Sequence, residues 1–198
     1  MPRGWGGPVA IARLGNDPQD ANWNGTEGTA RAAAERQIRE GYFVIRTCGL
    51  YGAAGSSGKG GNFVENMLKK ATAGEAIRVV ADQVLTPTYT MDLAEVTRSL
   101  IMTGAFGLYH LSSEGQCSWY EFTRSIFECA GIAAQLTAVK TAGFPSPVKR
   151  PSYSVLSKMK LRGLRLSVPS WQDALLRYLQ ERSKRSLPSS PTLVNSTS

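Results

Sequence analysis

The chain of 198 residues is short of the residues from which metal sites, disulfide frameworks and membrane spans are built. It has one histidine and three cysteines, and Cys48, Cys117 and Cys129 are too few and too widely spaced for a disulfide framework or a CxxC metal site. No apolar run reaches the ~18 residues that a membrane span needs. The first residues are interrupted by Gly and Pro and closed by Arg13, which makes a poor signal peptide. We therefore expect a cytoplasmic protein with reduced thiols, no metal and no membrane partner.

Acidic residues are scarce in one part of the chain, which explains the net charge of +8. Residues 140–198 carry eleven Lys and Arg against Asp173 and Glu181, whereas the remainder is close to neutral. These positive charges are scattered through a loop, two expected helices and a Ser/Pro-rich tail, and they are not interleaved with aromatic residues as in a strand-binding groove. The pattern favours a solvated face and a loose end over a nucleic-acid surface, so no nucleic-acid partner is expected.

Short apolar runs alternate with segments of helical period, which predicts an α/β fold. Helices are expected at 29–40, 62–74, 93–104, 118–130 and 169–182, and strands at 42–47, 77–80, 107–112 and, on an edge, 136–139. Asn62 is a candidate N-cap, and Ser118 with Glu121 fits a capping box. Residues 1–27 are predicted to be irregular, 28–182 to form the folded domain, and 183–198 to be a disordered tail.

The loop at 52–61, GAAGSSGKGG, suggests phosphate binding but has neither the spacing of a P-loop nor the order of a dinucleotide fingerprint. Its glycines and Asn62 at the following helix start are compatible with a diphosphate site, and equally with a flexible connector.

Isolated polar residues have structural interpretations. His110 lies in an expected strand, where a lone histidine is more often packed and hydrogen-bonded than catalytic. Cys48 has no activating partner nearby in the sequence, and Asp82 and Asp92 are expected to cap a turn and a helix.

Six segments in unbroken order resemble dTDP-4-dehydrorhamnose reductase, a family of extended short-chain dehydrogenases/reductases. They are VIRTCGLYG (44–52), GGNFVENMLKKA (60–71), IRVVADQVLTPTYTMDLAE (77–95), GLYHLSSEGQCSWYEFTRSIFECAG (107–131), FPSPVKRPSYSVLSKMKL (144–161) and PSWQDALLRYLQE (169–181). The resemblance runs from about residue 28 to 182.

This resemblance implies an incomplete Rossmann-like NAD(P)-binding sheet followed by the smaller nucleotide-sugar-binding domain of the family. Its members use NADPH to reduce dTDP-4-dehydro-L-rhamnose to dTDP-L-rhamnose, a precursor of surface polysaccharide. By position, Thr47 and Cys48 would face the cofactor and Gly49 the sugar. Asn62 would approach the diphosphate and Arg150 the nucleotide end, where its guanidinium fork suits phosphate oxygens.

The sequence departs from the family at the catalytic pair, a Tyr four residues before a Lys. Those positions fall at Glu27 and Arg31, so no catalytic residue is intact. The part of the family that holds its Gly-rich NADPH fingerprint and first strands has no counterpart ahead of these motifs. A sugar-contacting Trp of the family is replaced by Gly49, which predicts weak dTDP-sugar binding that a Gly49→Trp substitution would strengthen.

We interpret the chain as the back part of a dTDP-4-dehydrorhamnose reductase-like enzyme that is inactive by itself. The alternative is a non-catalytic nucleotide-sugar-binding or regulatory module that acts through a protein partner. A homodimer or a partner subunit is compatible with either hypothesis.

Overall fold

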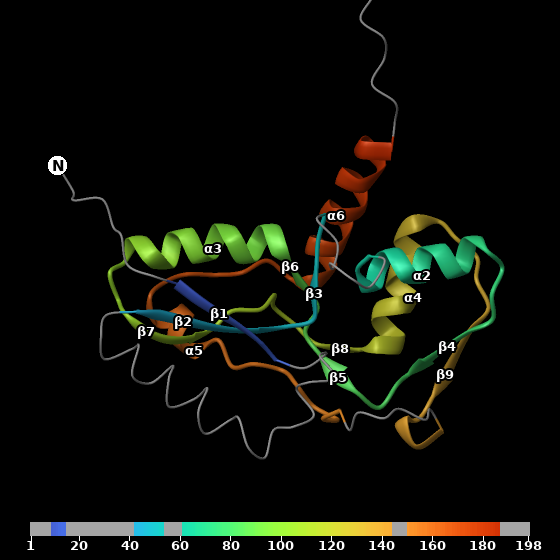
Figure 1. Ribbon diagram of the computed structural model, residues 1–198, viewed down its shortest axis with the longest axis horizontal. Coiled ribbons are helices and arrows are strands. Elements are labelled where there is room, and N and C mark those ends of the chain that lie inside the picture. The colour runs from blue at the N-terminus through green and yellow to red at the C-terminus, as the bar shows by residue number, and fades with distance from the viewer. Residues whose placement is uncertain (1–8, 15–41, 54–60, 144–149, 187–198) are drawn as a thin grey trace, which may run out of the picture.

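The computed structural model describes residues 9–14, 42–53, 61–143 and 150–186. Its largest sheet has three parallel strands in the order β1-β2-β7. These strands are β1 (Val9–Leu14), β2 (Phe43–Cys48) and β7 (Gly107–His110). Phe43 of β2 lies opposite Val9 on one side and Gly107 on the other, so all three strands end at the same edge (Figure 1).

One face of this sheet is covered by α3 (Thr90–Met102), and α5 (Met159–Gly163) adjoins β7. The core between them is aliphatic and aromatic because alternate residues of each strand point to the helix. It comprises Phe43, Ile45, Leu93, Val96, Leu100, Tyr109, Leu111, Leu161 and Val168.

A second core lies beside the sheet, around α2 (Phe63–Thr72), α4 (Trp119–Ala130) and α6 (Trp171–Ser186). A parallel pair, β4 (Ile77–Val80) with β9 (Leu136–Val139), closes this lobe (Figure 1). Aromatic rings dominate the packing. The ring centroid of Tyr51 lies 5.3 Å from that of Tyr178, edge to face, and 5.6 Å from that of Phe122. Such ring pairs stabilise the packing beyond the area they bury.

Short elements join the two lobes. They are β3 (Leu50–Tyr51) paired with β6 (Thr88–Tyr89), β5 (Val84–Leu85) paired with β8 (Cys117–Ser118), and the 3-10 turn η2 (Thr141–Gly143). Asp82 caps η2, because its carboxylate accepts hydrogen bonds from the backbone N–H and the hydroxyl of Thr141.

Most of the expected elements are confirmed. The strands at 42–47, 77–80, 107–112 and 136–139 appear as β2, β4, β7 and β9 with small shifts at their ends. Asn62 caps α2, and the capping box of Ser118 and Glu121 opens α4. No helix among the described residues is long and apolar enough to cross a membrane.

Two expectations are wrong in detail. The segment 1–27, predicted to be irregular, contains β1, which pairs along its whole length with β2; a six-residue strand is defined by that neighbour more than by its own sequence. The tail was expected to begin at Ser183, but α6 continues to Ser186. β4 is only half-buried, with Arg78 exposed, because it belongs to a two-stranded sheet.

The expected helix at 29–40, the positions Glu27 and Arg31, and most of the Gly-rich loop lie outside the described residues. The same is true of residues 144–149 and of the tail after Ser186.

Candidate functional site

The carboxyl ends of β2 and β7 bring together hydroxyl groups from two segments that are distant in sequence. The backbone N–H of Leu111 bonds to the carbonyl of Arg46 at 2.9 Å, which places Thr47 alongside Ser112 and Ser113. All three of these residues are fully buried, and their hydroxyl oxygens have no partner within the described part of the chain. Ligands of parallel α/β sheets bind at this edge, so it is the first candidate site.

Cys48 packs into this edge as a neutral thiol. It is 1% exposed, and its Sγ donates to the carbonyl oxygen of Thr86 at 3.4 Å. Burial raises the pKa of the Cys48 thiol, against the smaller opposing effects of that bond and of the Lys158 charge. The structural interpretation of Cys48 agrees with this geometry, because a protonated buried thiol is a poor nucleophile.

Gly49 forms the turn that leads from β2 into β3. Its φ is +59°, and a Cβ at this position would lie 2.6 Å from the carbonyl oxygen of Thr86 and 3.0 Å from Cα of Pro87. The carbonyl of Gly49 also accepts a 2.9 Å bond from the N–H of Thr88. A side chain here would meet backbone atoms, so Gly49→Trp requires the Thr86–Pro87 turn to move, and its predicted gain in sugar binding stays a prediction.

Lys158 places a buried positive charge next to the same edge. Its Nζ donates to the carbonyl of Ser113 at 2.8 Å and lies 3.7 Å from a carboxylate oxygen of Glu114. Glu114 also pairs with Arg162 at 3.0 Å. Sequence reasoning did not single out Lys158, because nothing in SKMKL distinguishes a buried lysine from the exposed Lys160 beside it.

Asn62 lies at the start of α2, and its side-chain amide is bonded at both ends. The Oδ1 atom accepts from the N–H of Glu65 at 3.1 Å, while Nδ2 donates to the carbonyl of Gly52 at 2.7 Å and to the Tyr178 hydroxyl at 2.9 Å. The bond to Gly52 draws together the two ends of the Gly-rich loop. Both amide hydrogens are therefore used within the protein, and the predicted diphosphate contact requires one of them to be exchanged.

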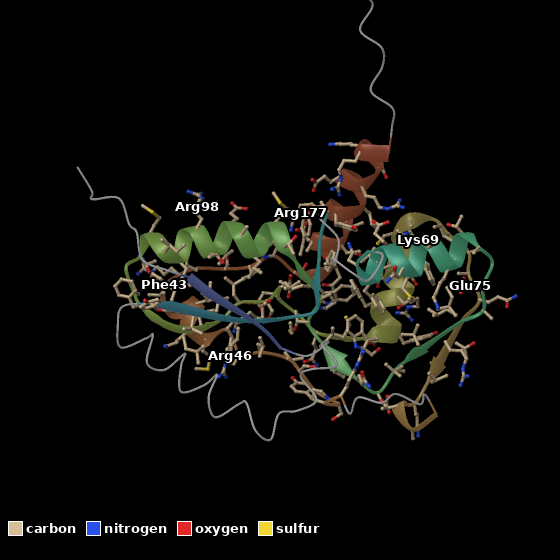
Figure 2. The ribbon with its side chains drawn as sticks, in the orientation of Figure 1. Phe43, Arg46, Lys69, Glu75, Arg98 and Arg177 are labelled. Atoms are coloured by element: carbon tan, nitrogen blue, oxygen red, sulfur yellow. The ribbon has the colours of Figure 1, made fainter. Side chains whose placement is uncertain are left out.

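Asp92 does not cap its helix as the sequence suggested. The helix begins two residues earlier, at Thr90, and the Asp92 carboxylate accepts both arms of the Arg177 guanidinium at 2.7 and 2.8 Å. Asp92 is 3% exposed, and this bidentate bond is the leading cause of the raised pKa of Arg177. The pair joins α3 to α6, and Figure 2 shows Arg177 where the two helices meet.

Arg150 is exposed, in the segment that leads to Ser152 and Tyr153 beside β5. The N–H of Val84 bonds to the carbonyl of Ser152 at 2.8 Å, which holds this segment against the joining strands.

His110 is half-buried on β7, and its Nδ1 lies 3.2 Å from the carbonyl oxygen of Ser157. This is the hydrogen-bonded histidine that the sequence suggested. It is opposite Arg46, on the strand neighbouring its own.

A cavity of about 600 Å³ lies between α3 and α6, lined by residues that include Tyr89, Asp92, Arg98 and Arg177. None of the predicted site residues lines it. Among the described residues, no group of three or more His, Cys, Asp or Glu could hold a metal ion.

A parallel sheet with ligand-type residues at its carboxyl edge and a smaller lobe beside that edge is the architecture of the Rossmann-like, extended short-chain dehydrogenases/reductases. Solved structures of that class at low identity share the fold. UDP-glucose 4-epimerase from Thermotoga maritima is one, at 15% identity and a TM-score of 0.63.

The sequence model of the RmlD substrate binding domain matches residues 18–184, and the chain belongs to that family. It is 44% identical over 140 residues to the Bacillus subtilis spore coat polysaccharide biosynthesis protein SpsK, covering 71% of this chain and 47% of that protein. It is 32% identical over 185 residues to the Escherichia coli dTDP-4-dehydrorhamnose reductase, covering 82% and 60%.

The crystal structure of the Bacillus anthracis dTDP-4-dehydrorhamnose reductase in complex with NADP superimposes with a TM-score of 0.72 at 34% identity. That superposition covers 87% of this chain and 65% of the other. The resemblance drawn from the motifs is thus confirmed at the level of the family and fold. The chain spans between about half and two thirds of the length of these relatives.

Proposed function

We propose that this chain provides the sugar-nucleotide-binding part, and the last strands of the cofactor sheet, of a dTDP-4-dehydrorhamnose reductase. One observation supports this most. The chain at Thr47–Gly49, where β2 ends, packs against the Thr86–Pro87 turn, beside the lobe whose first helix, α2, is capped by Asn62. The relatives described above include a reductase and a polysaccharide biosynthesis protein, which favours this function over a non-catalytic regulatory module.

The residues at the strand ends suit the nicotinamide end of NADPH. Thr47, Ser112 and Ser113 carry neutral hydroxyls, and the raised pKa keeps the Cys48 thiol protonated, which suits an uncharged ring. The Lys158 ammonium beside them is already bonded to the Ser113 carbonyl and paired with Glu114. NADPH, when bound, supplies the hydride for reduction of a sugar ketone. In this proposal Thr47 and Cys48 line the cofactor, and the Gly49 backbone borders the sugar.

The dTDP moiety is assigned to the other lobe. Asn62 meets the diphosphate at the α2 N-terminus, where backbone N–H groups favour an anion, and Arg150 meets the nucleotide end. Arg150 is exposed, and none of the described residues pairs with its guanidinium, so it is available for such a contact.

We do not assign catalysis to this chain, because the family's Tyr and Lys positions fall at Glu27 and Arg31. A glutamate side chain is ordinarily ionised at neutral pH and accepts hydrogen bonds where a proton donor is required. We therefore propose that the chain binds dTDP-sugars without reducing them. The cytoplasmic location, the absence of a nucleic-acid partner, and a homodimer or partner subunit stay predictions.

Two measurements test the proposal. Calorimetric titration with dTDP should show binding that Asn62→Ala and Arg150→Ala each weaken, with Arg165→Ala as an exposed-arginine control. NADPH oxidation in the presence of dTDP-4-dehydrorhamnose should stay at the no-protein rate, with the full-length E. coli reductase as positive control. Folded protein that fails to bind dTDP, or turnover by the unaided chain, would contradict the assignment.

A further inference from the structure

The two hydrogens of the Asn62 amide go to partners of different kinds. One is donated to the backbone carbonyl of Gly52 at 2.7 Å and the other to the hydroxyl of Tyr178, on α6, at 2.9 Å. Asn62 is 7% exposed, so water does not readily replace either partner. A phosphate oxygen that binds this amide must take the place of one of them.

Of these two hydrogen bonds, the one to Tyr178 costs less free energy to break, because its acceptor keeps another hydrogen-bond partner. Gly52 is buried, and a buried carbonyl that loses its donor bears the cost of an unsatisfied acceptor. The Tyr178 hydroxyl, by contrast, keeps its own bond to a carboxylate oxygen of Glu65 at 2.7 Å. Burial, with a further contribution from Glu65, raises the pKa of Tyr178 to about 12, so this hydroxyl remains a donor at neutral pH.

We propose that Tyr178 is a positioning residue that competes with a bound diphosphate for one hydrogen of the Asn62 amide. The inference rests on the proposed function, in which Asn62 meets the diphosphate of a dTDP-sugar. In the free chain this Asn62 N–H donates to the Tyr178 hydroxyl. In the complex the same N–H donates to a phosphate oxygen instead, while the bonds of Asn62 to Gly52 and Glu65 keep the amide in place.

The charges around Asn62 permit an anion to approach. The Glu65 carboxylate accepts from the Tyr178 hydroxyl, and the Nε of Arg182 pairs with both of its oxygens at 2.9 and 3.0 Å. The Glu65 charge is thereby compensated before any ligand binds. Arg185, one turn after Arg182, acts on Tyr178 as a further positive charge.

The chain offers a matched pair of substitutions for the test. Tyr178→Phe removes only the hydroxyl, because the ring remains packed against Tyr51 and Tyr89, with ring centroids 5.3 and 5.6 Å away. Tyr51→Phe removes a hydroxyl from the same aromatic cluster, and that hydroxyl is buried without a partner among the described residues. The second variant therefore controls for any general effect of losing a tyrosine hydroxyl.

The experiment is calorimetric titration of the full chain and its variants with dTDP and, separately, with thymidine. Tyr178→Phe should bind dTDP about fivefold more tightly, the effect of releasing one neutral hydrogen bond. Tyr51→Phe should bind like the unmodified chain. The gain from Tyr178→Phe should vanish in an Asn62→Ala background, and it should be absent for thymidine, which has no phosphate.

The possible failures are distinguishable. If Asn62→Ala weakens dTDP binding but Tyr178→Phe leaves it equal or weaker, the competition is overturned while the proposed function stands. An equal gain for thymidine would show that the hydroxyl acts on packing and would also overturn the inference. If the unmodified chain and Tyr178→Phe both melt cooperatively and bind no dTDP, the proposed function fails and this inference fails with it.

Discussion

Gly49 and Gly74 both have positive φ, +59° and +71°, but their surroundings differ. A Cβ at Gly74 would meet nothing within 4 Å, whereas one at Gly49 would lie 2.6 Å from the Thr86 carbonyl oxygen. Gly74→Ala should therefore lower the free energy of unfolding only by the backbone strain of a left-handed residue, about 1 kcal/mol. Gly49→Ala adds a collision with rigid backbone and should cost about 3 kcal/mol or more.

Urea denaturation of both variants measures this difference. Gly49→Trp should be at least as destabilised as Gly49→Ala. A Gly49→Trp protein that matches the unmodified chain in stability would show that the Thr86–Pro87 turn can move aside.

His110 is the one histidine of the chain and makes stability depend on pH near neutrality. Burial lowers its pKa from the usual 6.5, and the positive charges of Arg46 and Lys160 add to this effect. The unfolded chain therefore takes up a proton at a higher pH than the folded chain, so stability falls as the pH drops below about 6.5.

Melting temperatures between pH 5 and 7.5 should decline toward acid, and His110→Gln should flatten that slope. Asp82 and Glu121 also have lowered pKa values, but the loss of stability on protonating them occurs only below about pH 4.5, outside this window. An unchanged slope in His110→Gln would assign the pH dependence to other groups.

At the scale of elements, the attachment of α6 to α3 depends on the pair of Asp92 and Arg177. The side chain of Asp92 is 4% exposed and that of Arg177 is 38% exposed, so solvent partly screens the interaction. Arg177→Met leaves a buried carboxylate without its partner and should lower the free energy of unfolding by about 2 kcal/mol. Breaking a fully buried pair would lower it more.

The neighbouring Asp173 provides the control for that prediction. It also pairs with Arg177, at 2.8 Å, but its side chain is 56% exposed. Asp173→Asn should change the free energy of unfolding by less than about 0.5 kcal/mol in urea titrations. Equal losses for Asp173→Asn and Arg177→Met would show that burial of Asp92 does not decide the energetics.

At the scale of the whole molecule, the C-terminal boundary is testable by truncation. A chain that ends at Ser186 retains all of α6 and should melt within about two degrees of the full chain. A chain that ends at Arg182 retains the ion pair with Glu65 but loses the last turn, in which the Ser183 hydroxyl bonds to the carbonyl of Leu179 at 3.0 Å.

A disordered tail that begins at residue 183, as the sequence predicts, would let this shorter chain melt like the full one, and differential scanning calorimetry compares the two directly. We now expect it to melt a few degrees lower than the chain that ends at Ser186, because the helix terminus frays. A large loss on truncation at Ser186 would mean that residues 187–198 pack against the fold.

Local chemistry in the sequence was enough to predict the α/β class, β2, the Asn62 cap and the Ser118–Glu121 capping box. These features depend on residues within a few positions of one another, and their periods and spacings are visible in one dimension. The ordered motifs likewise identified the family. Tertiary structure alone decided the partners of isolated polar groups: Arg177 for Asp92, Tyr178 for Asn62, and Ser113 with Glu114 for Lys158. It also decided that position 49 has no room for a side chain. These partners are more than 40 residues apart in the sequence. Only packing determines which of many similar side chains is buried beside which.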